Sequence, residues 1–428
     1  MRKDITKYTQ NLVGFQVVSE KVLLSDTMEI AELSRLARLP IRRLRKATIN
    51  VWIERTKFRC PHCGSEEVSI YFERHRMVRG VANANIPVVI RFGAHRIYCR
   101  DCGERSYEEF KFLPGSKSHI TSQLARTIVA LRSEMSIKAI SDYFDIPWDV
   151  VKNVEKAQLA KDYAKIPLNK VTALGIDEIC VFRHAKSDEK YVTVVRNLET
   201  GDVLYVGDGK GVKALEGFIE RIRRWRRRIR YVCMDMSNAY AKWVLENLPD
   251  AEIVFDHFHV IKAMNDRLDK IRRRTMAKAD EELKKVIKGN RYLLTGNAED
   301  LTPSGRARLI EMRNAFSELS DAHGLKEQLR GIYEAARYEF GARILLEDWC
   351  ATARATEVPE LVSMAETIEK HLDGVLGYWK HNGASNAKTE GFNNKIRWLI
   401  RQAYGFRDRE YFKLKIYALP DTETLKSL

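Results

Sequence analysis

Three acidic residues stand in separate, well-marked settings along the chain: Asp177, Asp235 and Glu390. Asp177 lies in an alternating apolar stretch typical of a strand, and Asp235 follows a short apolar run typical of a buried strand that ends there. Glu390 lies near the start of a predicted helix, on a polar face that it shares with Arg397. Carboxylates from two strands and a helix can hold two divalent cations about 3.5–4 Å apart, which activate water and stabilise a leaving oxygen. The pattern therefore predicts a metal-dependent centre for phosphodiester cleavage.

The elements around these acids are predicted to form a ribonuclease-H-like mixed sheet with helices on both faces. Strand patterns, the first three joined antiparallel, occur at residues 172–182, 191–197, 203–207, 231–234 and 252–255. The glycine-rich residues 207–211 lack the spacing and Ser/Thr of a P-loop, so we expect them to connect a strand to a helix. Residues 260–383 are predicted to be an all-α insertion before the final helix. The predicted catalytic domain therefore comprises residues 169–259 and 384–420.

Two C-x-x-C-G pairs supply a second candidate metal site, with Cys60 and Cys63 in the first pair and Cys99 and Cys102 in the second. Each pair makes a tight knuckle with two thiolates, and two knuckles complete a tetrahedral zinc shell. Disulfides are disfavoured in the cytoplasm, and a thioredoxin-type site needs only one pair. We predict one structural zinc ion per chain, without an open coordination position, in a zinc ribbon at residues 51–113.

Residues 114–168 show helical periodicity with the spacing of a helix-turn-helix unit, although any small helical bundle can produce this pattern. Its last predicted helix exposes Lys152, Asn153 and Lys156, which can reach bases or phosphates of double-stranded DNA. Residues 1–50 are predicted to be a helical and basic segment with a helical stretch at 27–37, and the sequence does not decide whether this is another small DNA-binding or dimerising unit.

Four motifs resemble those of the ISL-three family of DDE transposases from bacterial insertion sequences. They read GIDE at Asp177, DMSNAY at Asp235, DHFHVIK from Asp256, and NAKTEGFNNKIRWLIRQAYGFRD around Glu390. The resemblance runs from about residue 52 to residue 418 and keeps the order of the motifs. It implies a zinc ribbon and a helix-turn-helix domain in front of a ribonuclease-H-like DDE domain, in a multidomain α/β protein.

The resemblance also implies an activity: binding of terminal inverted repeats, followed by strand cleavage and strand transfer. Asp177, Asp235 and Glu390 would hold two catalytic Mg²⁺ ions per site. Because both DNA ends must meet, we expect a homodimer or a higher synaptic complex. Two rival functions stay open: a catalytically silent DNA-binding regulator derived from a transposase, and a structure-selective nuclease that cleaves without joining.

The charge of the chain favours a polyanionic partner. Its 74 Lys and Arg residues exceed its 58 Asp and Glu residues, which gives a formal net charge of +16. Seven arginines crowd into residues 221–230, and we expect phosphate contacts from Arg223, Arg224 and Arg227, unless this run is only a solvated face. A second basic group occupies residues 270–274. With no membrane-length apolar run and no signal peptide pattern, we expect a cytoplasmic, nucleoid-associated protein.

Several residues near the predicted centre keep two interpretations. His259 either positions the scissile phosphate and assists proton transfer, or caps the following helix. Trp349, Tyr378 and Trp379 either pack a helical bundle, which we favour, or stack on unpaired bases. If Glu390 is not the third metal ligand, Asp256 is the first alternative.

Overall fold

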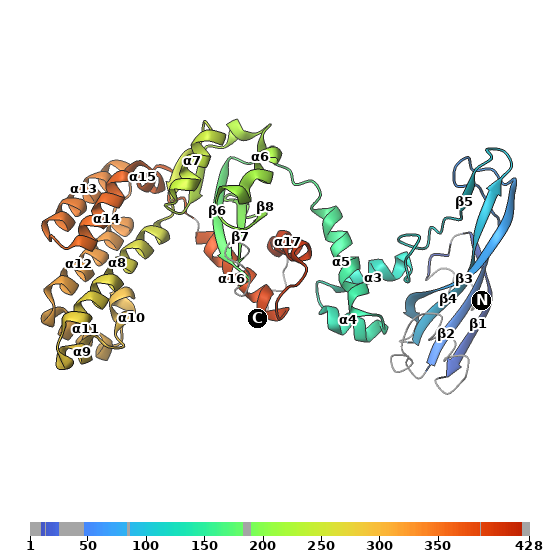
Figure 1. The fold of residues 1–428 in the computed structure, drawn as a ribbon, viewed down its shortest axis with the longest axis horizontal. Helices are drawn as coiled ribbons and strands as arrows, with labels where there is room; N and C mark the ends of the chain where they lie inside the picture. The colour runs from blue at the N-terminus through green and yellow to red at the C-terminus, as the bar shows by residue number, and fades with distance from the viewer. Residues whose placement is uncertain are drawn as a thin grey trace. The chain divides into compact units, whose positions relative to one another are not determined.

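The chain divides into two compact units (Figure 1). The first unit comprises Met1–Ala164 and Thr422–Leu428, and the second comprises Lys165–Asp421. The computed structural model describes residues 10–12, 14–24, 47–83, 86–182, 190–385 and 387–421. The side chains of residues 22–24, 47, 387–390 and 421 lie outside that description. Within the described residues, no helix has the length and apolar character needed to cross a membrane.

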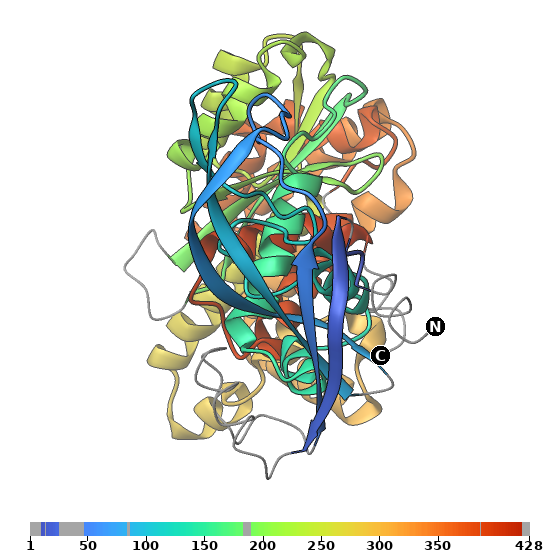
Figure 2. The same ribbon diagram turned by 90° about the vertical axis from the view of Figure 1, so that its right-hand side faces the viewer.

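The first unit is built on a sheet in the order β1-β2-β4-β3, with β5 added beside β4. Its long strands are drawn in blue shades in Figure 2. The strands are β1 (Phe15–Leu24), β2 (Ala47–Arg55), β3 (Val68–Asn83), β4 (Ile86–Cys99) and β5 (Arg105–Tyr107). Strands β2 and β4 run parallel, whereas β1–β2, β3–β4 and β4–β5 are antiparallel. Apolar side chains of β2 and β4, such as Val51 and Ile90, are fully buried in the core.

The sheet is larger than the small ribbon expected from the sequence. Between the two cysteine pairs the structure forms the long strand β4, because β3 pairs with it over most of its length. Residues 1–50 were predicted to be a helical and basic segment, yet Phe15–Leu24 is a strand that pairs with β2. The helical stretch predicted at 27–37 lies outside the described residues.

The helix-turn-helix pattern predicted after the ribbon is present as three helices. They are α3 (Ser122–Leu131), α4 (Ile137–Phe144) and α5 (Trp148–Asp162). The Ser136 hydroxyl caps α4 by accepting a hydrogen bond from the Ala139 N–H, as its position predicted. In the turn before α5, Asp145 adopts a left-handed φ of 52° and its carboxylate pairs with the buried Arg79 of β3 at 3.0 Å. This buried ion pair ties the turn to the sheet.

The second unit contains the predicted mixed sheet, in the order β10-β9-β6-β7-β8. Its strands are β6 (Ala173–Cys180), β7 (Tyr191–Asn197), β8 (Val203–Asp208), β9 (Tyr231–Met234) and β10 (Glu252–Phe255). Strands β6, β7 and β8 are joined antiparallel, and β6, β9 and β10 run parallel. This arrangement confirms the ribonuclease-H-like order expected from the sequence.

Helices cover both faces of this sheet. They include α6 (Glu216–Ile222), α7 (Asn238–Asn247), α16 (Ala387–Gln402) and α17 (Arg409–Ala418). Alternation along β6 turns Ile176 toward the core that it shares with Tyr240 and Trp243 of α7. The next residue, Asp177, therefore faces the opposite side, where α16 lies.

The all-α insertion follows β10 and forms one helical cluster beside the sheet (Figure 1). Its helices are α8 (His257–Lys278), α9 (Glu281–Ile287), α10 (Arg291–Thr295), α11 (Pro303–Ala315), α12 (Ser317–Ala335), α13 (Glu339–Ala355), α14 (Pro359–Lys370) and α15 (Leu372–Lys380). Helix α8 starts directly after β10, and α15 packs back on the same strand. A Cβ at Gly374 would lie 2.5 Å from the Phe255 ring, so only glycine permits this close approach. The insertion thus begins and ends at the edge of the sheet.

Candidate active site

Three aspartates lie at the same level of three neighbouring parallel strands, Asp177 within β6 and Asp235 and Asp256 directly after β9 and β10. The register pairs Gly175 of β6 with Cys233 of β9, so Asp177 and Asp235, each two residues further along, follow at matching positions. Strand β10 continues the pattern, because the Asp256 N–H donates to the Met234 carbonyl at 2.9 Å. The sheet therefore gathers Asp177, Asp235 and Asp256 at one edge.

Asp177 is held by two hydrogen bonds in a partly buried position. The Asn393 side-chain amide of α16 donates to one carboxylate oxygen at 2.6 Å, and the Glu178 N–H donates to the other at 2.8 Å. Burial raises the pKa of Asp177, and these two hydrogen bonds oppose that effect. Helix α16 is thereby fixed against β6 at the carboxylate.

One carboxylate oxygen of Asp235 has no hydrogen-bond partner among the described residues. Its Oδ1 is buried and accepts no hydrogen bond from any residue that the structure describes. Burial raises the pKa of Asp235, the negative charges of Glu178 and Asp177 raise it further, and His259 lowers it. A buried carboxylate oxygen beside a second carboxylate is the donor set that a hard divalent cation prefers. Asp177 and Asp235 therefore fit a catalytic cation.

Glu390 lies in the first turn of α16, three residues before Asn393. The side chain of Glu390, the third predicted ligand, lies outside the described residues. Among the residues whose side chains are described, the four cysteines are the group whose ligand atoms already lie close enough to share one ion.

His259 and Asp256 form a pair beside the two catalytic candidates. The His259 Nδ1 lies 3.2 Å from Asp256 Oδ2, and Asp256 is buried at the N-cap position of α8. The hydrogen bond to Asp256 raises the pKa of His259, and the negative charges of Asp177 and Asp235 add to that effect. The His259 ring therefore lies within electrostatic reach of both carboxylates.

A cavity of about 710 Å³ opens beside this cluster. Strand β6 contributes Asp177, and the helical insertion contributes His259, Arg330, Tyr333 and Tyr378. Further lining comes from Glu178, Asp256, His257, Phe258, Ile261, Lys262, Asn265, Asn297, Glu334, Asn393 and Arg397. Cationic, amide and aromatic groups thus surround a space next to the acids, a composition suited to a nucleotide.

The three aromatic residues singled out from the sequence have different environments. Trp349 and Trp379 are buried, and their indole N–H groups donate to the carbonyls of Leu325 and Ala336. Both tryptophans therefore pack the insertion, as favoured from the sequence. Tyr378 lines the cavity instead.

Two functional candidates escaped the sequence analysis. One is Asn393, whose side chain reaches Asp177. The other is Glu178, which accepts hydrogen bonds from the Tyr240 hydroxyl and the Gly211 N–H and so anchors residues 207–211 against β6. The signal available in the sequence was the position of Glu178 directly after Asp177. Successive residues of a strand point to opposite faces of a sheet, so Glu178 was bound to lie on the face opposite Asp177. As predicted, the glycine-rich residues connect β8 to the next helical turn.

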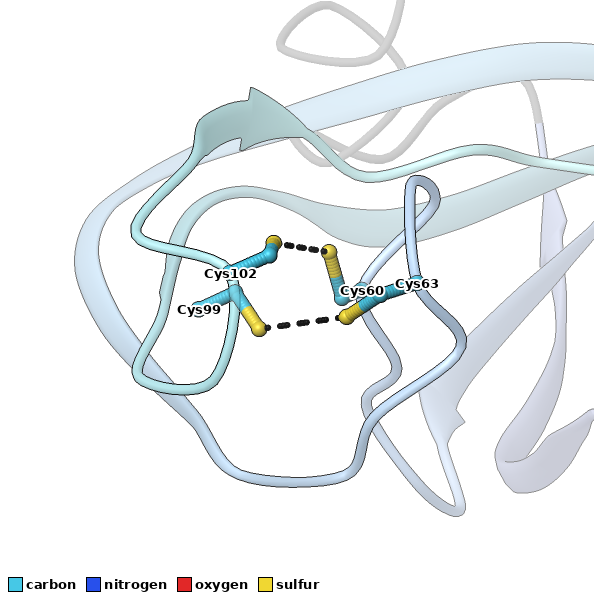
Figure 3. Close-up of side chains that lie close together, drawn as sticks. All are labelled: Cys60, Cys63, Cys99 and Cys102. Atoms are coloured by element: carbon cyan, nitrogen blue, oxygen red, sulfur yellow. Dashed lines mark hydrogen bonds between the residues drawn. The ribbon is translucent and has the colours of Figure 1, made fainter.

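The four cysteines converge from two knuckles of the first unit (Figure 3). Each knuckle turns at a glycine with positive φ, 78° at Gly64 and 71° at Gly103. All four sulfur atoms lie within 4.8 Å of one another, with Cys60–Cys102 at 3.6 Å and Cys63–Cys99 at 3.5 Å. A tetrahedral zinc ion with bonds of about 2.3 Å separates its sulfur ligands by roughly 3.8 Å. The cluster therefore fits a structural zinc ion.

The predicted DNA-contact residues of the first unit lie on α5. Asn153 is exposed, and Lys152 and Lys156 are partly exposed. In the second unit, Arg397 lines the cavity and donates to Asn394 at 2.7 Å.

The two arginine clusters of the second unit differ. Arg223 and Arg224 are exposed after α6, and Arg227, also exposed, lies 3.7 Å from Asp250. In the second cluster, by contrast, Arg274 pairs with Glu318 and Glu360 at 2.7 Å each. Arg272 and Arg273 of that cluster both pair with Asp269. Arg274 thus links α8 to α12 and α14, whereas Arg272 and Arg273 pair within α8.

Comparison with known proteins identifies the family. The family model for ISL-three-type DDE transposases, described as "Transposase", matches residues 174–416. The transposase for insertion sequence element IS1001 of Bordetella parapertussis is 28% identical over 377 residues, covering 87% of this chain and 91% of the relative. The transposase for insertion sequence element IS1557 of Mycobacterium tuberculosis is 27% identical over 379 residues, covering 82% of each.

The Drosophila P element transposase strand transfer complex aligns with a TM-score of 0.40 and 12% identity, over 76% of this chain and 95% of that chain. This similarity is too weak to establish a shared fold. The family match, in contrast, spans more than half of the chain and includes both aspartates of the site. The chain belongs to the ISL-three family of transposases.

Proposed function

We propose that Asp177, Asp235 and Glu390 hold two Mg²⁺ ions and that the chain cleaves DNA strands at the ends of an insertion sequence and joins them to target DNA. The observation that carries this proposal is the hydrogen bond from Asn393 to Asp177, because it brings α16, the helix of Glu390, to the level of the sheet where Asp177 and Asp235 lie.

When bound, the two ions would activate a water and stabilise the charge on the leaving oxygen. In the first step the water attacks the phosphorus at the element's end, the phosphorus–oxygen bond to the 3′-oxygen breaks, and a 3′-hydroxyl is released. In the second step this hydroxyl attacks a phosphorus in target DNA by the same in-line displacement and releases the 3′-oxygen of the target strand. The first step converts one phosphodiester and one water into a 3′-hydroxyl and a 5′-phosphate, and the second step exchanges one phosphodiester and one hydroxyl for one of each.

The protein's own residues would orient these reactants. Asn393 and the Glu178 N–H fix both oxygens of Asp177, so this carboxylate is set in place before the substrate arrives. His259, held by Asp256 and facing the acids, would position the scissile phosphate. Arg397 would contact the DNA backbone from the same cavity.

End recognition would involve the first unit. We propose that α5 reads double-stranded DNA through Lys152, Asn153 and Lys156, and that the cysteine cluster holds one zinc ion that stiffens the ribbon. Arg223, Arg224 and Arg227 would contact phosphates. Because two ends must be brought together, the active species would be a homodimer or a higher assembly.

The test compares Asp177→Asn, Asp235→Asn and Glu390→Gln with the parent protein on duplexes carrying the element's ends. Each variant should lose Mg²⁺-dependent cleavage and joining while end binding stays within about twofold, because an amide lacks the charge that holds Mg²⁺ against its hydration shell. The matched control is Asp202→Asn, which changes an exposed aspartate in the turn between β7 and β8. Normal cleavage by all three variants would refute the proposal and leave a DNA-binding regulator as the better account. Cleavage without joining of a pre-cut end would favour a nuclease.

A further inference from the structure

Four aromatic side chains are exposed together on the sheet of the first unit, where β3, β4 and β5 pair: Tyr71, Phe72, Tyr98 and Tyr107. Their exposed fractions range from 38% for Tyr98 to 61% for Tyr107. Aromatic rings contribute most to stability when they are buried, so a cluster that stays in contact with water indicates a binding surface.

Strand register places these rings on one face. Phe72 lies opposite Arg96, and Arg96 lies opposite Tyr107, so the three form one row across the sheet. Tyr98, two residues after Arg96, starts the next row and lies opposite Arg105. Residues two apart on a strand point to the same face, so the side chains of both rows lie on one face of the sheet.

The other side of β4 is the interior side, since Ile97 between the two rows is only 1% exposed. Tyr71 also reaches the outer face, because the pairing of β3 with β4 shifts between Ile70 and Phe72. The irregularity thus allows two consecutive aromatic residues to serve one surface.

Two arginines lie between the rings. The Arg96 Cζ is 4.3 Å from the centre of the Tyr107 ring and 6.0 Å from that of Phe72. The Arg105 Cζ is 6.0 Å from the centre of the Tyr71 ring and 5.9 Å from that of Tyr98. A guanidinium is planar and permanently charged, so it extends a stacking surface and also binds phosphate. We call Tyr71, Phe72, Tyr98, Tyr107, Arg96 and Arg105 the aromatic platform.

We infer that the aromatic platform binds single-stranded DNA, with unpaired bases stacked on the rings and phosphates held by Arg96 and Arg105. Flat aromatic groups on an open sheet face, interleaved with arginine, are the groups on which unpaired bases stack irrespective of sequence. Along a strand the two rows are about 7 Å apart, and neighbouring strands are about 5 Å apart, so the aromatic platform has room for two or three bases.

Charge favours DNA over a protein partner for this face. The chain carries a net charge of +16. Of the acids near the cysteine knuckles, Glu66 is paired with Arg59 at 2.7 Å, and Asp101 accepts a hydrogen bond from Ser65. A duplex keeps its bases stacked inside, so only an unpaired strand can use the rings. This inference goes beyond the proposed catalysis and needs neither the metal centre nor the recognition helix.

The test is fluorescence anisotropy on the full chain with EDTA-free, Mg²⁺-free buffer, using a labelled 12-residue oligothymidine and a duplex of unrelated sequence. The double variant Phe72→Ala/Tyr107→Ala should bind the single strand about tenfold or more weakly and the duplex within about twofold of the parent. Arg96→Lys, which keeps the charge and loses the planar group, should give a smaller loss on the single strand. The matched control is Tyr338→Ala/Phe340→Ala, which removes two exposed aromatics from the second unit.

Zinc content and molar mass by light scattering are measured on the same samples. Unchanged single-strand binding in the double variant, or equal losses on both DNAs, would overturn the inference. Loss of zinc or a change of oligomeric state would also overturn it, since the face would then serve folding or contact between copies. Photocrosslinking of a bromouracil-substituted strand to Phe72 or Tyr107 in the parent protein supports it, and crosslinks confined to other residues contradict it. Because no cleavage is measured, failure here leaves the catalytic proposal untouched.

Discussion

Replacing Asn393 by Ala tests whether the helix of Glu390 controls the carboxylate of Asp177. The substitution removes the amide that donates to Asp177 at 2.6 Å and leaves the Glu178 N–H at 2.8 Å as the remaining donor among the described residues. A hydrogen bond to a charged group contributes about 1.5–3 kcal/mol, which corresponds to roughly 10–150-fold in an equilibrium constant. Side chains that orient a metal ligand typically contribute about 10–100-fold to metal affinity or activity. We therefore expect a loss of about 10–100-fold.

The measurement is the apparent affinity for Mn²⁺, followed by electron paramagnetic resonance or calorimetry, together with the rate of end cleavage at subsaturating Mg²⁺. Removal of the amide also removes an effect that lowers the pKa of Asp177, so burial should raise that pKa further. Protons then compete better with the cation, and the affinity of the variant should fall at a higher pH than that of the parent. Thermal unfolding should change little, because the substitution also removes Asn393 Oδ1, which is buried without a partner among the described residues, and this offsets the loss of the hydrogen bond to Asp177.

The matched control is Asn394→Ala, which removes the neighbouring, exposed amide that pairs with Arg397. It should leave Mn²⁺ affinity within about twofold of the parent. If Asn393→Ala bound Mn²⁺ as tightly as the parent, with the same pH dependence, the orienting role of Asn393 would be refuted.

Three further outcomes are expected. Cys99→Ser should reduce zinc content, measured by elemental analysis, from about one ion per chain toward zero, because one of four sulfur ligands is lost. In EDTA at neutral pH, Asp235→Asn should raise the melting temperature. Burial raises the pKa of Asp235, so ionisation of this carboxyl at neutral pH opposes folding. The cost is about 1.4 kcal/mol for every unit by which folding raises the pKa. This gain should vanish below pH 3.8, where the carboxyl of the unfolded chain is also protonated. Arg79→Ala leaves Asp145 buried without its 3.0 Å partner, which costs about 3–5 kcal/mol, so amide exchange in α4 and α5 should accelerate by about 100-fold or more.

Local patterns in the sequence were enough to predict most individual elements. Strands β9 and β10 have the predicted bounds, because short apolar runs between polar residues have few alternatives. The helix-turn-helix was predictable because Ser136 caps α4 and the turn at Asp145 interrupts the periodicity. Strand β1 was not foreseen, since its partner β2 lies beyond residues 25–46 and strand pairing across such a distance leaves no local pattern.

The candidate site was also predictable in part from local patterns in the sequence. Asp177 lies within a strand pattern and Asp235 directly after one, both recognisable in the sequence, and the register brings the two to matching positions of β6 and β9. Asn393 was missed because one amide on a polar helix face looks like any other until the packing of α16 on β6 is known. Glu178 was missed because its partner Tyr240 is 62 residues away in sequence. The role of Glu390 stays a prediction.

The 216 residues that separate Asp177 from Asn393 have a consequence for the order of synthesis. A ribosome completes residues 1–164, the β-rich part of the first unit, and the strands of the sheet in the second unit well before it completes α16, and domains generally fold in that order during synthesis. A nascent chain that has emerged only as far as the helical insertion would carry its DNA-recognition unit without the helix that closes the carboxylate site. Premature termination within the insertion would thus produce a fragment that competes for DNA ends but cannot cut them, so truncated products of the gene would restrain the full-length protein.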